Sequence, residues 1–307
     1  MPHDKAHIKR QLQADGALAV VTLIWGSTFP LVKDVVQQVP PMTFLSVRFM
    51  LGAVALAIIT VIARRWRGLT LRELRWGLLI GLFLWAGYAL QTLGLQLTTA
   101  SNGGFITGLS VVFVPIFGFF LFRQKPRGWA LLGVAMATVG LTLLSLRLDE
   151  GLRINMGDAL VFGCALAFAM QIVAIAHVAS WADPFRLALV QITTAGLLNA
   201  ISALVVERPL GGLGIEIWAA AAFLGIAATT LAIVIMVSVQ RFTSAVHTAL
   251  IFTLEPVFAA MFAFWLQGDR LGIVALTGAA LIVVGMLVAE LAPQLWAARQ
   301  RRQIREA

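Results

Sequence analysis

Long runs of apolar residues without a charged side chain recur along the chain. No residue from 76 to 122 is charged, and further uncharged runs cover 128–146, 159–182, 187–206, 217–240 and 271–289. A bilayer core of about 30 Å takes roughly 20 residues of helix, so these runs are long enough to cross it. They lack the two-residue alternation of barrel strands and therefore predict membrane-spanning helices.

The runs and their polar flanks predict ten spans. These are 15–35, 42–63, 74–95, 99–121, 128–147, 157–179, 184–206, 216–238, 243–266 and 270–291. The predicted fold class is an all-α, polytopic membrane protein. Composition agrees, because 60% of the 307 residues are hydrophobic and 12% are charged, whereas soluble domains carry about 25% charged residues. A water-soluble globule and a disordered chain are both excluded.

Basic residues predict the orientation of the spans. With the N-terminus inside, seventeen Lys and Arg fall on inner segments and five on outer segments. The positive-inside rule then places both termini in the cytoplasm, with the chain in the cell (inner) membrane. The segments 1–14 and 292–307 become cytoplasmic tails, the second of them basic. We assign the net charge of +9 to this topology, with the lipid bilayer rather than nucleic acid as the partner.

The two halves of the chain resemble each other. In order along the sequence, the matches are Pro41 and Arg48 with Pro184 and Gln191, Gly81 and Gln96 with Gly225 and Gln240, and Gly133 and Gly140 with Gly278 and Gly285. The shift stays between 143 and 145 residues, which predicts five-helix repeats at 15–147 and 157–291 joined by a linker at 148–156. Because five is odd, the second repeat is inverted, and inverted repeats place a binding site near the bilayer midplane.

Several motifs resemble the EamA family of the drug/metabolite transporter superfamily. They are Trp25-Gly26-Ser27-Thr28-Phe29-Pro30, Arg48-Phe49, the run from Thr98 to Phe105 with Pro115, and Leu254-Glu255-Pro256-Val257. The resemblance covers residues 15 to 291 and implies a secondary transporter of small organic solutes, often an exporter of amino acids, with a cavity between its halves. In the repeat register Trp25 falls opposite Phe168, so the second copy lacks the tryptophan motif.

Glu255 is the acidic side chain placed deepest in a predicted span. It lies twelve residues into span nine, about 18 Å along the axis and so near the midplane. A charge costs several kcal/mol there unless it is paired or faces a cavity. Glu255 either binds a cationic group or a proton, or it is neutral or paired, for example with Arg48, and only holds helices together. Both interpretations stay open.

Arg48 and Gln191 occupy matching positions in spans two and seven. Arg48 lies about six residues from the outer end of its span, close enough for its side chain to reach the interface. It is therefore either an interfacial anchor or structural pair, or an anion-binding group. The polar character of its counterpart Gln191 suggests that both positions face inward.

Other polar and aromatic side chains inside spans are candidates for the cavity wall. Trp85, Tyr88 and Gln91 follow at three-residue steps on span three, as Trp25 and Thr28 do on span one. Aromatic side chains at this spacing also pack against neighbouring helices or lie at the membrane–water interface. Asn102, Gln171 and His247 could bond polar groups of a substrate or a neighbouring helix. His247 shares a helix face with Glu255, which allows a proton path from the cytoplasm.

Three prolines and several missing motifs complete the functional prediction. Pro30, Pro115 and Pro256 interrupt spans one, four and nine and are candidate hinges, although membrane helices also tolerate proline. The sequence has no nucleotide loop, no hydrolase motif and no acidic pair for a divalent metal. We therefore expect no catalytic residue, no cofactor and no metal.

The sequence as a whole favours a carrier. We expect a non-enzymatic secondary transporter that exports small metabolites such as amino acids by alternating access around a midplane cavity, with protons or an exchange solute as possible coupling partners. A membrane sensor or scaffold without transport is the alternative. A membrane-embedded lipid-modifying enzyme is a further one, but it would need polar residues clustered at one interface, which the sequence lacks.

Overall fold

The computed structural model describes residues 2–126, 128–145, 155–207, 212–267 and 272–306. Most of the predicted linker 148–156 therefore lies outside the described residues. Within them the chain is helical, without a strand. The first half comprises α1 (Pro2–Val36), α2 (Pro41–Ile62), α3 (Leu71–Leu97), α4 (Ala100–Gly108), α5 (Ser110–Phe122) and α6 (Gly128–Ser145).

The second half repeats this order with more interruptions. It comprises α7 (Met156–Val178), α8 (Pro184–Ser202), η1 (Ala203–Glu207), α9 (Ile215–Phe223), η2 (Leu224–Leu231), α10 (Ala232–Val239), η3 (Gln240–Phe242), α11 (Ala245–Phe252), α12 (Leu254–Gln267) and α13 (Ile273–Glu306). The segments η1 and η2 are π-helical, and η3 is a single 3₁₀ turn.

These helices confirm the all-helical, polytopic fold. In the described part of the chain, nine helical segments are long and apolar enough to cross a membrane, and Gly128–Leu144 is apolar but shorter. Each predicted span coincides with one of these segments. Exposed leucine, isoleucine, valine and phenylalanine side chains are frequent on the outer faces of the helices, as expected where lipid rather than water surrounds a helix bundle.

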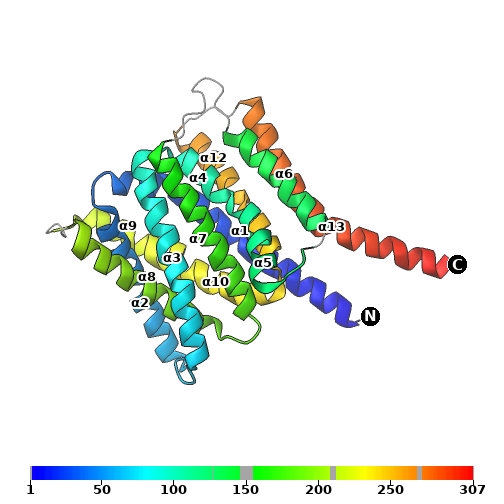
Figure 1. Ribbon diagram of the computed structural model, residues 1–307, viewed down its shortest axis with the longest axis horizontal. Coiled ribbons are helices and arrows are strands. Elements are labelled where there is room, and N and C mark those ends of the chain that lie inside the picture. Colours follow the sequence, from blue (N-terminus) through cyan, green and yellow to red (C-terminus); the bar gives the residue numbers. More distant parts are fainter. Residues whose placement is uncertain (1, 127, 146–154, 208–211, 268–271, 307) are drawn as a thin grey trace.

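Both chain ends leave the bundle on the same side (Figure 1). We call this end the terminal face and the other end the opposite face. At the terminal face the start of α3 meets the start of α8, since Glu73 Oε1 lies 2.8 Å from Arg186 Nη2. At the opposite face the end of α3 meets the start of α7, since Thr98 donates to Asp158 at 2.6 Å. The chain thus alternates between faces, and α7 starts at the face opposite to α1, so the two repeats are inverted.

Close helix contacts follow the repeat symmetry. Gly140 packs against Gly278, where an added methyl group would lie 2.7 Å from the Gly278 carbonyl oxygen, and Gly133 packs against Gly285 at the same distance. Because Gly133 corresponds to Gly278 and Gly140 to Gly285, exchanging the repeats converts one contact into the other. The contacts join α6 to α13, which run side by side at the edge of the bundle (Figure 1). A two-fold pseudo-axis therefore relates the halves.

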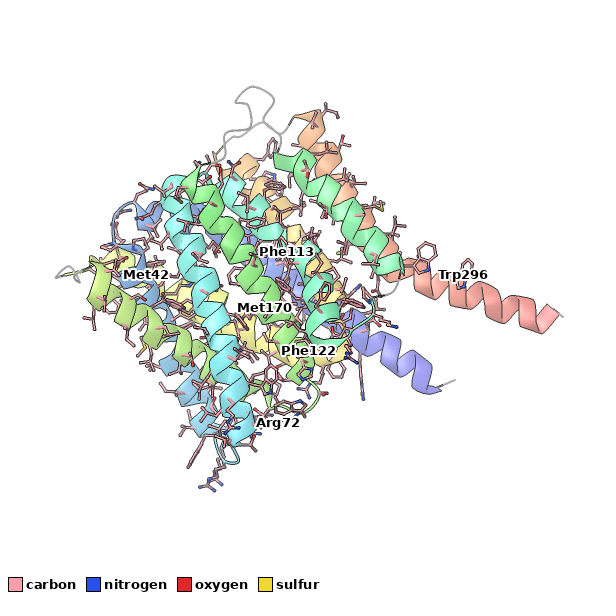
Figure 2. All side chains as sticks on the ribbon, in the orientation of Figure 1. Met42, Arg72, Phe113, Phe122, Met170 and Trp296 are labelled. Atoms are coloured by element: carbon pink, nitrogen blue, oxygen red, sulfur yellow. The ribbon has the colours of Figure 1, made fainter. Side chains whose placement is uncertain are left out.

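Helices of different halves also interlock. Gly81 in α3 packs against Gln191 in α8, and its repeat equivalent Gly225 packs against Arg48 in α2. At the terminal face Arg72 lies over the Trp181 ring at 4.0 Å, and Phe122 stacks on His177 with centroids 4.2 Å apart. Figure 2 shows Arg72 and Phe122 toward the same end of the bundle. The halves are thus interwoven rather than separate bodies.

Replacing Gly140 by alanine should destabilise the contact of α6 with α13. The added methyl would also lie 2.8 Å from Ile282 Cγ1, and overpacking of this kind costs about 1–3 kcal/mol of unfolding free energy. Gly128→Ala is a matched control in α6, because no atom lies within 4 Å of its methyl position. Thermal unfolding in detergent compares the two. Equal midpoints for both variants would contradict the close approach of the two helices.

Candidate functional site

A cavity lies between the halves, lined by helices of both. Its aromatic wall consists of Trp25, Phe29, Tyr88, Phe168 and Phe252. Its polar groups are Thr28, Arg48, Gln91, Thr107, Ser110, Gln171 and Glu255. The space free of protein atoms, including the open mouth, is about 760 Å³. An apolar wall with few polar groups is typical of small-molecule pockets.

Two broken helices meet at this cavity. The helix pair α4–α5 is interrupted at Leu109, and the pair α11–α12 at Thr253. Both pairs begin with the same cap, because Thr99 and Ser244, 145 residues apart, accept hydrogen bonds from the backbone N–H three residues on. The residue that follows each break is thus placed near the middle of the bundle. Interrupted helices at equivalent positions of inverted repeats are typical of transporter binding sites.

Ser110 is the first residue after the break at Leu109, and Glu255 is the second residue after the break at Thr253. They are 145 residues apart, and both line the cavity. Equivalent positions of the two repeats therefore contribute to the same cavity. The carboxylate of Glu255 forms no hydrogen bond or ion pair with another described residue, and the proposed pair with Arg48 is not among the ion pairs of the described residues.

The tryptophan and Glu-Pro motifs touch each other. A methyl group on Gly26 would lie 2.7 Å from the Glu255 carbonyl oxygen, so glycine lets α1 pack directly against α12. Beside this contact the Trp25 indole donates to the Ala228 carbonyl at 2.7 Å, and its ring meets Phe252 edge-on at 5.0 Å between centroids. Ala228 belongs to the π-helical η2, and such bulges are frequent at functional sites.

Arg48 is buried in the cavity wall, with an exposed fraction of 2%. Its Nε donates to the hydroxyl of Thr229 in η2 at 2.9 Å. Its guanidinium carbon lies 4.8 Å from the centroid of the Tyr88 ring, within the range of a cation–π contact. No carboxylate among the described residues forms an ion pair with it. The side chain is thus held in place while the remaining guanidinium N–H groups can serve a bound anion.

Amide side chains complete the polar wall. Gln91 donates to the Thr107 hydroxyl at 3.1 Å, and Gln171 donates to the Gln191 side-chain oxygen at the same distance. Gln191 itself is fully buried behind Gln171 and does not line the cavity. Its Nε2 has no hydrogen-bond acceptor among the described residues.

Besides Gln191, three candidate residues of the cavity wall lie away from its lining. Trp85 packs against the core of the bundle, and Asn102 lies in the first turn of α4. His247 lies in the first turn of α11, where its Nε2 is 2.9 Å from Glu290 and 3.3 Å from Asp15. Helix geometry explains why Trp85 does not reach the cavity that Gln91 lines. Each step of three residues falls about 60° short of a full turn, so two steps set Trp85 about 120° from Gln91 around the helix.

The three candidate hinge prolines differ in their surroundings. Pro256 is the third residue of α12, and its ring faces the turn that contains Phe252, next to the break at Thr253. Pro115 lies inside α5, six residues beyond the break at Leu109, and Pro30 lies inside the continuous helix α1. Of these breaks, only the one at Thr253 follows directly from the position of a proline.

Sequence reasoning did not identify several residues of the cavity wall. Phe168 was assigned only as the counterpart of Trp25 in a copy without the motif, yet both rings line the cavity. Ser110 could have been found as the repeat equivalent of Glu255. Thr107 carries no sequence signal of its own, because hydroxyls are common in membrane helices and often bond their own backbone.

Comparison with known proteins identifies the family. The profile of the EamA-like transporter family matches residues 13–146 and 155–290. An uncharacterized transporter of Archaeoglobus fulgidus is 32% identical over 282 residues, which cover 92% of this chain and 87% of the relative. The uncharacterized transporter YyaM of Bacillus subtilis is 24% identical over 279 residues, 87% of this chain and 90% of that one.

A solved crystal structure agrees on the fold. It superposes with a TM-score of 0.75 at 20% identity and covers 92% of this chain and 99% of that chain. At this identity the likeness concerns the fold alone. The family profile, in contrast, matches once in each half of the chain, as the inverted repeats require. The chain belongs to the EamA-like transporter family and is a multi-pass membrane transporter.

Proposed function

We propose that this transporter exports small zwitterionic metabolites, such as amino acids, by alternating access around the central cavity. The observation that carries the proposal is that one buried guanidinium, Arg48, and one carboxylate, Glu255, both line the same cavity. A substrate carboxylate would bond Arg48, and its ammonium group would bond Glu255. The aromatic wall would hold an apolar side chain.

The symmetry of the site supports alternating access. Ser110 and Glu255 follow equivalent helix breaks of inverted repeats. The two halves can therefore exchange conformations, each adopting the packing that the other has now. Such an exchange would open the same cavity to the other face of the membrane. The excess of basic residues on one side supports placing the protein in the inner membrane with its terminal face toward the cytoplasm.

Glu255 is the proposed coupling group. Without a nucleotide-binding motif, uphill export would depend on a proton gradient or on exchange of one solute for another. A carboxylate in the cavity that forms no ion pair with a described residue can take up a proton when substrate leaves. The amide of Gln91 and the hydroxyl of Ser110 would serve polar groups of the substrate.

Flux through proteoliposomes tests the proposal. We expect saturable counterflow of at least one amino acid in the wild type, with faster uphill movement under a pH gradient. Glu255→Gln keeps the size of the side chain but not its charge, and it should lose the response to the pH gradient. Glu216→Gln is the matched control, because Glu216 is an exposed acid in the first turn of α9.

The outcomes are distinguishable. Wild-type protein without saturable counterflow for a broad panel of amino acids and related metabolites would overturn the carrier proposal and favour a sensor or scaffold. If Glu255→Gln keeps both counterflow and the full response to pH, Glu255 only holds helices together. If it keeps counterflow but loses the response, the carboxylate carries the coupling proton.

A further inference from the structure

Asp15, His247 and Glu290 converge at the terminal face, outside the cavity. Asp15 belongs to α1, His247 to α11 and Glu290 to α13. His247 Nε2 lies 2.9 Å from Glu290 Oε2 and 3.3 Å from Asp15 Oδ2. One donor atom from each side chain lies within 4.8 Å of the other two. The export proposal gives this cluster no role.

We propose that this cluster binds a divalent transition-metal ion such as Zn²⁺ or Mn²⁺. The donor set is one imidazole nitrogen and two carboxylate oxygens, a combination that suits such ions. Ions of this kind bind these donors at about 2.0–2.2 Å, which places neighbouring donors about 2.8–3.6 Å apart, from octahedral to tetrahedral geometry. The two distances from His247 Nε2 match the edges of such a coordination shell.

The Asp15 carboxylate has capacity for a further ligand. Its Oδ2 lies 3.3 Å from His247 Nε2, but its Oδ1, shielded from solvent, accepts no hydrogen bond from a described residue. A single ring nitrogen carries one proton at most, and the short distance to Glu290 directs that proton away from Asp15. A metal ion is not limited in this way, because it can bind all three donors at once.

The surrounding helices hold the ligands in position. The hydroxyl of Ser244 caps α11 by accepting from the His247 backbone N–H at 3.2 Å, which fixes the turn that carries the ring. Gln11, one turn before Asp15 in α1, donates to Glu290 Oε2 at 3.2 Å. Supporting bonds of this kind orient metal ligands. An ion bound here would join α1 of the first half to α11 and α13 of the second.

Metal binding by the full-length protein tests the site. Protein purified without a histidine tag and stripped with a chelator is titrated with Zn²⁺ and, separately, with Mn²⁺. We expect one ion per chain with a raised unfolding temperature. Asp15→Asn should weaken binding at least tenfold, since even the loss of a supporting residue costs about 10–100-fold in affinity. Asp34→Asn, an exposed acid of the same helix, should bind as the wild type does.

A measurement on the wild type covers the case in which the variants fail to fold. X-ray absorption of the zinc-loaded protein should show only nitrogen and oxygen donors, with one imidazole. The proposal is overturned if neither ion binds saturably to the wild type, or if Asp15→Asn binds as tightly as the wild type. It is also overturned if the bound zinc has two or more imidazole donors. None of these results depends on which solute is transported.

Discussion

Replacing Arg48 by glutamine, the residue at the equivalent position 191, is expected to raise the half-saturation concentration for amino-acid counterflow about 10–100-fold. Hydrogen bonds to charged groups contribute about 1.5–3 kcal/mol, and each 1.4 kcal/mol corresponds to tenfold in affinity. The fold should survive, because no described carboxylate forms an ion pair with Arg48. The substitution therefore leaves no buried charge without a partner. Counterflow in proteoliposomes over a range of substrate concentrations measures the effect.

Two controls separate anion binding from a packing defect. The amine that corresponds to the substrate but lacks its carboxylate should move equally through wild type and Arg48→Gln. Arg48→Lys keeps the positive charge but not the planar fork, which bonds Thr229 and in the proposal would also bond a substrate carboxylate, so an intermediate loss is expected. If the amine and the amino acid are impaired by the same factor, Arg48 shapes the helices and does not bind the substrate.

The spans could be predicted from the sequence because hydrocarbon imposes one rule on every segment. Each crossing must satisfy its own backbone and present apolar side chains, which leaves long uncharged runs. The breaks at Leu109 and Thr253 follow no such rule. Pro256 explains the second, but Leu109 lies six residues before Pro115, and its turn depends on how α4 and α5 pack against other helices.

The polar cavity residues were predictable only where they stand out from their surroundings. Arg48 and Glu255 are charged residues in apolar segments, so composition alone marks them, and the cavity contains both. Phe168 and Thr107 look like ordinary membrane residues, and only the fold brings them to the cavity. The Asp15, His247 and Glu290 cluster left no motif, because its members belong to three helices that are far apart in sequence.

Replacing Glu73 by glutamine is expected to cost about 3 kcal/mol of unfolding free energy. The Glu73 side chain is 3% exposed and accepts from Arg186 Nη2 at 2.8 Å, from the Asp183 backbone N–H and from the Thr70 backbone N–H. Breaking a buried pair costs about 3–5 kcal/mol, because the remaining charge is left without its partner. We expect the lower value, since Arg186 is 20% exposed and can reach water.

Thermal unfolding in detergent, with Glu216→Gln as an exposed first-turn control, tests this expectation. The control should lie within about 0.5 kcal/mol of the wild type. Removing both charges in Glu73→Gln with Arg186→Met should cost less than the sum of the single changes, because the second change removes the unpaired charge. Equal losses for Glu73→Gln and Glu216→Gln would show that the pair does not stabilise the fold.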